Sequence, residues 1–151
     1  MSESSTVGAG AVSGCDLVEK LLAVRQDMLV KFCTLAGLEP YSRQAPVVRH
    51  LQEFCQTLID YTAFGHFEML RGFAEAPDEV PQAKPLLEQV YPGISETTAA
   101  AVAFNDRYDA SDHALNLDHL SQDLSLLGER IAARIELEDR VLRLLLERCA
   151  Q

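Results

Sequence analysis

The last third of the chain carries an apolar stripe that fits only a helix. Leucine and isoleucine recur at steps of three and four residues, at Leu117, Leu120, Leu124, Leu127, Ile131, Ile135, Leu142 and Leu145. This spacing puts the side chains on one face of an α-helix, whereas a strand would need alternation with a period of two. No segment of the chain alternates in that way. The sequence therefore predicts an all-α protein with a long helix over residues 115–149.

Three earlier segments repeat the same helical spacing. Apolar stripes run over residues 16–36, over residues 46–74 and from residue 86 to about residue 108. The third stripe contains Pro92 and Gly93, a pair that kinks a helix or splits it in two, and we expect a kink. Four long amphipathic helices joined by short connections predict an antiparallel up-and-down four-helix bundle.

Length and composition indicate one domain. A chain of 151 residues suits a single core. Residues 1–15, rich in serine, glycine and alanine, predict a flexible N-terminal tail, which leaves residues 16–151 as the helical-bundle domain. The apolar runs are far shorter than the roughly 20 residues of a membrane span, and the start of the chain lacks the pattern of a secretory leader. We expect a cytoplasmic protein that does not enter a membrane.

The charge balance constrains the partners. Lys and Arg number 13 and Asp and Glu number 23, so the formal net charge is −10. Because this charge repels nucleic-acid phosphates, we expect no direct nucleic-acid binding, and a DNA-binding transcription factor is disfavoured. A basic protein segment or a basic small molecule would instead be attracted.

The second helix has an unusual outward face. With Leu51, Leu58, Thr62 and Met69 turned to the core at about 100° per residue, four other side chains fall near the opposite side. They are Asp60, Phe64, Phe67 and Arg71. Either the third helix or the tail covers this face, or it is a protein-binding patch with aromatic anchors beside a carboxylate. An acidic anchor suits a cationic partner.

A second exception to the stripes is Glu138, which occupies an inward step of the last helix beside Asp139. A buried carboxylate requires a partner, and His66 of the second helix could supply it. One interpretation is a structural network that ties two helices together. The alternative is a metal- or small-ligand-binding bundle that uses His66 and Glu138 with Tyr61.

Sequence motifs for chemistry are missing. The chain has no Glu-x-x-His pair of the kind that holds di-iron centres in bundles, and its four cysteines form no C-x-x-C pair. It also lacks the glycine patterns of nucleophile elbows and phosphate-binding loops. We therefore expect no metal site, no cofactor and no enzymatic activity.

Several segments together resemble one known family, named Rsd/AlgQ. Residues 54–61 read FCQTLIDY and residues 65–68 read GHFE, similar to the family signature F-C-Q-x-L-V-D-Y-x-S-A-G-H-F. The run ARIELED at 133–139 resembles the family's A/E-R-F-x-L-E-D, and Tyr91-Pro92 resembles its W/F-P pair. The first helix, from Leu17 through Arg25, is similar to L-V-D-R-W-L-x-x-R-x-x-L. The resemblance covers residues 16–149 in order.

The resemblance implies a function. Members of this family are cytosolic helical bundles that act as anti-sigma factors, and they bind region 4 of the primary sigma factor. It implies that Asp60 meets a sigma arginine and that Phe67 lies on the same contact face. Together with the outward face of the second helix, this predicts a sigma-binding site of Asp60, Phe64, Phe67 and Arg71, flanked by Leu21 and Arg25 of the first helix. From their positions on the helices, we expect Tyr61, His66, Glu138 and Asp139 to form an internal polar network. Self-association of the free protein stays open.

The chain departs from the family pattern at two places near this face. Leu21 stands where the family usually has tryptophan, and Ala63-Phe64 replaces Ser-Ala. The second change adds an aromatic side chain to the expected contact face, so affinity or the choice of sigma factor could differ.

Overall fold

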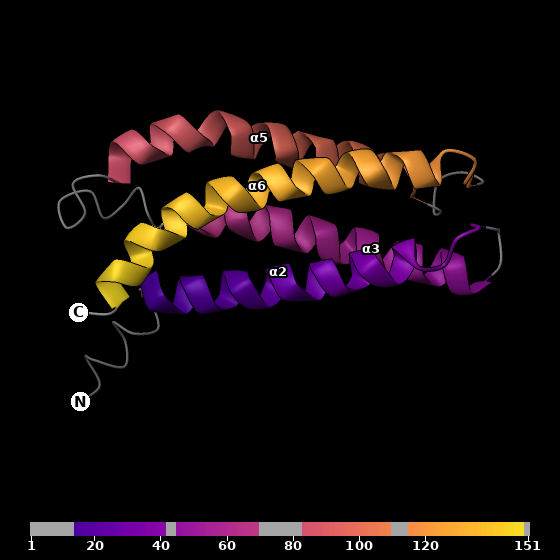
Figure 1. Ribbon diagram of the computed structural model, residues 1–151, viewed down its shortest axis with the longest axis horizontal. Coiled ribbons are helices and arrows are strands. Elements are labelled where there is room, and N and C mark those ends of the chain that lie inside the picture. Colours follow the sequence, from indigo (N-terminus) through magenta and orange to yellow (C-terminus); the bar gives the residue numbers. More distant parts are fainter. Residues whose placement is uncertain (1–13, 42–44, 70–82, 110–114, 150–151) are drawn as a thin grey trace.

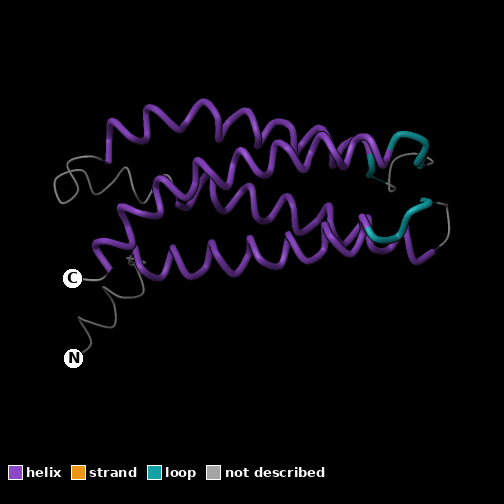
Figure 2. Tube along the Cα trace, in the orientation of Figure 1, coloured by secondary structure: helices purple, strands orange, loops and turns teal. Residues whose placement is uncertain are grey.

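The fold is a bundle of long helices that lie side by side with alternating direction (Figure 1). The computed structural model describes residues 14–41, 45–69, 83–109 and 115–149. Its α-helices are α2 (Gly14–Ala36), α3 (Ala45–Ala63), α5 (Ala83–Arg107) and α6 (Leu120–Cys149). A π-helix, η1 (Phe64–Met69), continues α3. Figure 2 shows only helices and short loops along the described trace.

The packing order follows the chain. The closest neighbours are α2 with α3 and α5 with α6, and the remaining contacts of α2 with α6 and of α3 with α5 close the ring. Consecutive helices run in opposite directions (Figure 1). The predicted all-α, antiparallel, up-and-down bundle is therefore confirmed. No helix in the described stretches has the length and apolarity that would let it cross a membrane.

Some helix ends differ from the sequence prediction. The last helix begins at Leu120 and not at residue 115, because residues 115–119 form a turn in which Asn116 accepts a hydrogen bond from the Asp118 amide at 2.9 Å. The third helix begins at Ala83, since Pro85 in its first turn needs no backbone donor. Of the predicted tail, Gly14 and Cys15 belong to α2, and residues 1–13 lie outside the described residues.

The Pro92–Gly93 pair does not split α5. The helix runs unbroken from Ala83 to Arg107 with Pro92 inside it, and its axis bows along its length in Figure 1. A Cβ on Gly93 would lie 2.4 Å from Cδ1 of Leu137. Glycine at this position therefore lets α5 approach α6 closely beside the proline.

The centre of the core is aromatic. Phe54 of α3 is fully buried and makes edge contacts with Phe32 of α2 and Phe104 of α5, with ring centroids 5.7 and 5.8 Å apart. Tyr108 extends the cluster, because its ring lies 4.7 Å from that of Phe104. One side chain of α3 thus joins the two halves of the bundle.

Replacement of Phe54 by alanine tests this centre. We expect Phe54→Ala to lower the free energy of unfolding by about 3–5 kcal/mol, the range for a large cavity left by an aromatic side chain. Val102→Ala, on the exposed side of α5, should change it by less than about 0.5 kcal/mol. Urea unfolding followed by circular dichroism measures both, and equal losses would contradict the assignment of Phe54 to the core.

Candidate protein-binding site

The candidate site lies where α3 changes into η1. Residues 64–69 form a π-helix, in which hydrogen bonds join residues five apart instead of four. The prediction of one uninterrupted α-helix over residues 46–74 is therefore wrong from Phe64 onward, and residues 70–74 lie outside the described residues. An angle of 100° per residue applies to an α-helix, so it does not give the directions of side chains beyond this point.

Asp60, in the last turn of α3, is exposed as the sequence predicted. Its carboxylate accepts a hydrogen bond of 3.1 Å from the Nε2 amide of Gln56, one turn earlier on the same helix. The acid therefore stands at the surface, held at the end of a rigid α-helix. Such a carboxylate is available to a cationic group of a partner.

Phe64 differs from its prediction. The ring is half-buried and packs against the core, and the ammonium of Lys20 lies 5.0 Å from the ring centroid, within the range of a cation–π contact. The expectation of a freely outward Phe64 is thus corrected, because α2 covers one side of the ring. The side chain of Phe67 and all of Arg71 lie outside the described residues.

The two residues of α2 that were expected to flank the face are turned inward. Leu21 is fully buried, so it supports η1 from beneath and offers no surface to a partner. The side chain of Arg25 is 12% exposed, and it binds Asp139 at 3.0 Å and Glu138 at 3.6 Å. Arg25 therefore belongs to the polar network inside the bundle.

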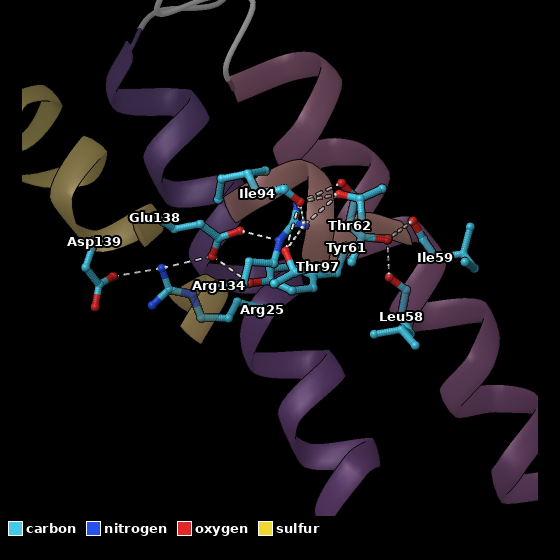
Figure 3. Close-up of polar contacts among 11 residues, drawn as sticks. Arg25, Leu58, Ile59, Tyr61, Thr62, Ile94, Thr97, Arg134, Glu138 and Asp139 are labelled. Carbon is cyan, nitrogen blue, oxygen red and sulfur yellow. Dashed lines mark hydrogen bonds and ion pairs between the residues drawn. The ribbon is translucent and has the colours of Figure 1, made fainter. Parts of the chain in front are cut away.

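Glu138 lies at the centre of this network and is fully buried. The hydroxyl of Tyr61 donates to one carboxylate oxygen at 2.5 Å, and Nε of Arg134 donates to the other at 2.9 Å (Figure 3). Asp139 lies at the edge, with its side chain 45% exposed and in contact with Arg25. Two carboxylates thus face two guanidinium groups.

Arg134 connects three helices. Its side chain is only 1% exposed, and its guanidinium lies 5.4 Å from the ring of Tyr61. Its Nη1 group lies near three acceptors of α5, the carbonyl of Ile94 at 3.2 Å and the hydroxyls of Thr97 and Thr98 at 3.0 and 2.8 Å. Nη2 donates to the backbone carbonyl of Thr62 at 3.0 Å (Figure 3). A residue of α6 thereby fixes the end of α3, where η1 begins.

Gly65 leaves room for this network. A Cβ at this position would lie 3.0 Å from Nη2 of Arg134 and 3.1 Å from Oε2 of Glu138. Both atoms are held by buried hydrogen bonds, so neither can move aside freely. The glycine of the sequence motif therefore has a steric reason, the close passage of η1 over a buried ion pair.

Burial and charge set the protonation states. Burial raises the pKa of Glu138, while Arg134, Tyr61 and Arg25 act in the opposite direction. The pKa of Tyr61 is raised by burial and by the Glu138 charge, so its phenol keeps its proton and donates. The Glu138 carboxylate is thus stabilised by the guanidinium groups and by the Tyr61 hydroxyl.

His66 does not take the place predicted for it. The partners of the Glu138 carboxylate among the described residues are Tyr61, Arg134 and Arg25, and the His66 ring packs against Tyr91 with centroids 5.5 Å apart. Burial and the Arg134 charge lower the pKa of His66. The cation expected opposite Glu138 is therefore arginine.

Sequence reasoning missed Arg134, although a signal was present. Arg134 lies three residues after Ile131 and four before Glu138, so it falls on the same buried stripe, at the spacing of a helical ion pair. Two opposite charges on one apolar stripe indicate a buried pair within a helix. Among the described residues, no group of three or more His, Cys, Asp and Glu side chains is placed to hold a metal ion.

The geometry defines a helical bundle with an exposed acid above a buried polar network, and comparison with known proteins identifies its family. Residues 3–146 match the model of Rsd/AlgQ, described as regulator of the RNA polymerase sigma(70) subunit, and the chain belongs to this family. The family is one of regulators and not of enzymes.

Curated relatives support the same assignment. The chain is 31% identical to the regulator of sigma D of Yersinia enterocolitica, over 85% of this chain and 79% of the relative. It is 29% identical to the regulator of sigma D of Yersinia pseudotuberculosis, over 85% and 78%. It is 31% identical to that of Enterobacter sp. strain 638, over 87% and 81%.

A double-mutant cycle tests the buried pair. We expect Arg134→Met and Glu138→Leu each to cost about 3–5 kcal/mol, because each leaves a buried charge without the partner to which it is hydrogen-bonded. The double variant should lose at least about 1 kcal/mol less than the sum of the two. Urea unfolding measures all three, with Glu136→Ala as a surface control on the same helix. Additive losses would show that the two residues are not coupled.

The histidine gives a pH dependence with a definite sign. The folded state binds the His66 proton less readily than the unfolded chain, whose reference pKa is 6.5. The free energy of unfolding should therefore fall as the pH drops below about 6.5. His66→Gln should reduce the difference in unfolding free energy measured between pH 7.5 and pH 5.5. An equal difference in both proteins would assign the titration to other groups.

Proposed function

We propose that this chain is an anti-sigma factor that binds region 4 of the primary sigma factor. By covering that region it blocks recognition of the −35 promoter element and the association of sigma with core RNA polymerase. Polymerase is thereby released to other sigma factors, and the protein acts in the cytoplasm, where transcription takes place. The observation that carries the proposal is the exposed carboxylate of Asp60, within the family motif of a chain that matches the family over residues 3–146.

Charge supports this choice of partner. A domain that reads DNA is basic, since it must neutralise phosphates, and this chain has a formal net charge of −10. Complementary charge speeds encounter and orients the two surfaces. In this proposal Asp60 meets an arginine of region 4, as the family resemblance implies.

The apolar part of the contact is proposed around η1. Phe64 offers the exposed part of its ring. Phe67 and Arg71, whose side chains lie outside the described residues, are proposed as further contacts from the sequence alone. Leu21 and Arg25 act beneath it, one as packing and the other through Asp139 and Glu138. The polar network of Tyr61, Arg134 and Glu138 holds the carbonyl of Thr62 and so fixes how α3 passes into η1. A preorganised face loses less conformational entropy on binding.

Charge reversal at Asp60 tests the proposal. Titration calorimetry of the full chain with isolated region 4 should give saturable one-to-one binding. We expect Asp60→Arg to weaken it by about 2 kcal/mol or more, roughly thirtyfold, because a paired charge is replaced by a like charge.

Glu136→Arg is the matched control, since it makes the same change of charge at an exposed position of α6. It should leave the affinity within about threefold. Equal effects of the two variants would indicate unspecific attraction and would move the site away from Asp60. Absence of binding by the unchanged protein would refute the proposed partner.

A further inference from the structure

A groove separate from Asp60 lies between α2 and α6, at the end of the bundle where α2 stops and α6 starts. Two adjoining hollows of about 570 and 540 Å³ form it, and both are bordered by Glu39, Tyr41 and Ser121. The hydroxyl of Ser121 donates to the Glu39 carboxylate and so ties the turn after α2 to α6. Asp60 lies near the other end of α3, a helix that does not line this groove.

Small side chains of α6 form the floor of the groove. Ser121, Ser125, Gly128 and Ala132 line it at steps of four, three and four residues, which places them on one helical face. The ring of Phe32 lies against Gly128, where a Cβ would come within 3.1 Å of it. Because Gly128 has no side chain, the aromatic ring rests in the floor and the groove stays open over about 16 Å, three helical turns.

The charged residues that line the groove all have one sign. Among the described residues around both hollows, the charged ones are Glu39, Asp118 and Glu129. By contrast, the charged residues around the hollow between α5 and α6 are Arg107, Arg130 and Asp123. Of the two hollowed sides of α6, the α2 side is therefore the acidic one and the α5 side is mixed in charge.

The end of α2 adds to this negative field. Its last turn contains no basic residue, and the carbonyl of Ala36 at its C-terminus accepts a hydrogen bond of 3.3 Å from Tyr41. The C-terminal end of a helix carries the negative end of its dipole and favours a nearby cation. The N-terminal end of α6, which carries the positive end of its dipole, also lies here. Two carboxylates, Asp118 just before the helix and Asp123 in its first turn, offset that positive charge.

We propose that the α2–α6 groove binds an amphipathic helix with lysine or arginine along the edges of its apolar face. The apolar face lies over Phe32 and the small residues of α6, in the manner of a helix laid in a groove. The basic edges meet Glu39 on one side and Glu129 on the other. This site is independent of the proposed sigma contact at Asp60, so the protein can hold two partners or two parts of one partner.

A pair of synthetic peptides tests the proposal on the full chain. The first is an amphipathic helical peptide of leucine and lysine, and the second has glutamate in place of lysine. Titration calorimetry should show saturable one-to-one binding of the lysine peptide and none of the glutamate peptide. Absence of binding by the lysine peptide, or equal binding of both, overturns the proposal.

Matched variants locate the binding. Ala132→Trp fills the groove at an exposed position and should weaken the lysine peptide at least about tenfold, whereas Ala133→Trp, the neighbouring exposed residue outside the groove, should stay within about twofold. Glu129→Lys should weaken it several-fold and Glu136→Lys little. Circular dichroism confirms that each variant is folded.

The remaining comparison separates this site from the sigma contact. Asp60→Arg should keep the affinity for the lysine peptide, whether or not region 4 binds the unchanged protein. Equal losses in the groove variants and their controls would show unspecific attraction by the acidic chain. Loss in Asp60→Arg would place the peptide on the α3 face. Either result overturns the α2–α6 site.

Discussion

The buried guanidinium of Arg134 is the interaction on which the order of this bundle depends. A charge at 1% exposure is costly unless every donor finds an acceptor, and here the acceptors come from α3, α5 and α6 itself. The hydrophobic stripes of the helices are compatible with many small rotations and shifts. The hydrogen bonds of one planar guanidinium group tolerate no such shifts. Arg134 therefore selects one arrangement of the helices among those that the apolar core would accept.

The fold could be predicted from the sequence because its signal is repeated many times. Each of the four stripes recurs over several turns, so a single exception such as Glu138 does not hide the period. The prolines indicate where α5 begins and where it bows. Its first residue is Ala83, before the apolar stripe, because Pro85 is tolerated in the first turn of a helix. The exposure of Asp60 followed from the same periodicity, since α3 is still α-helical there.

The site could be predicted only in part, because its details depend on contacts between helices. The change to a π-helix at Phe64 has no period that a projection could detect, and the contact of Phe64 with Lys20 depends on how α2 packs beside it. Leu21 and Arg25 belong to an apolar stripe with one charge, and only the position of α6 shows that the charge is used inside the bundle. The sequence pattern pairs Glu138 with His66 of another helix, whereas its nearest guanidinium belongs to Arg134, four positions away on the same helix.

The π-helix also makes the fit between η1 and the buried ion pair depend on the number of residues in this stretch. Residues 64–69 hold more residues per turn than an α-helix would, so the stretch acts as an added residue in an otherwise regular rod. Removing one residue between Thr62 and Gly65 would turn the glycine by about 100° relative to the Thr62 carbonyl that Arg134 holds, and a residue with a side chain would take its place over the ion pair. The buried ion pair therefore limits the length of this stretch, because a Cβ at the position of Gly65 would lie only 3.0 Å from Arg134 and 3.1 Å from Glu138.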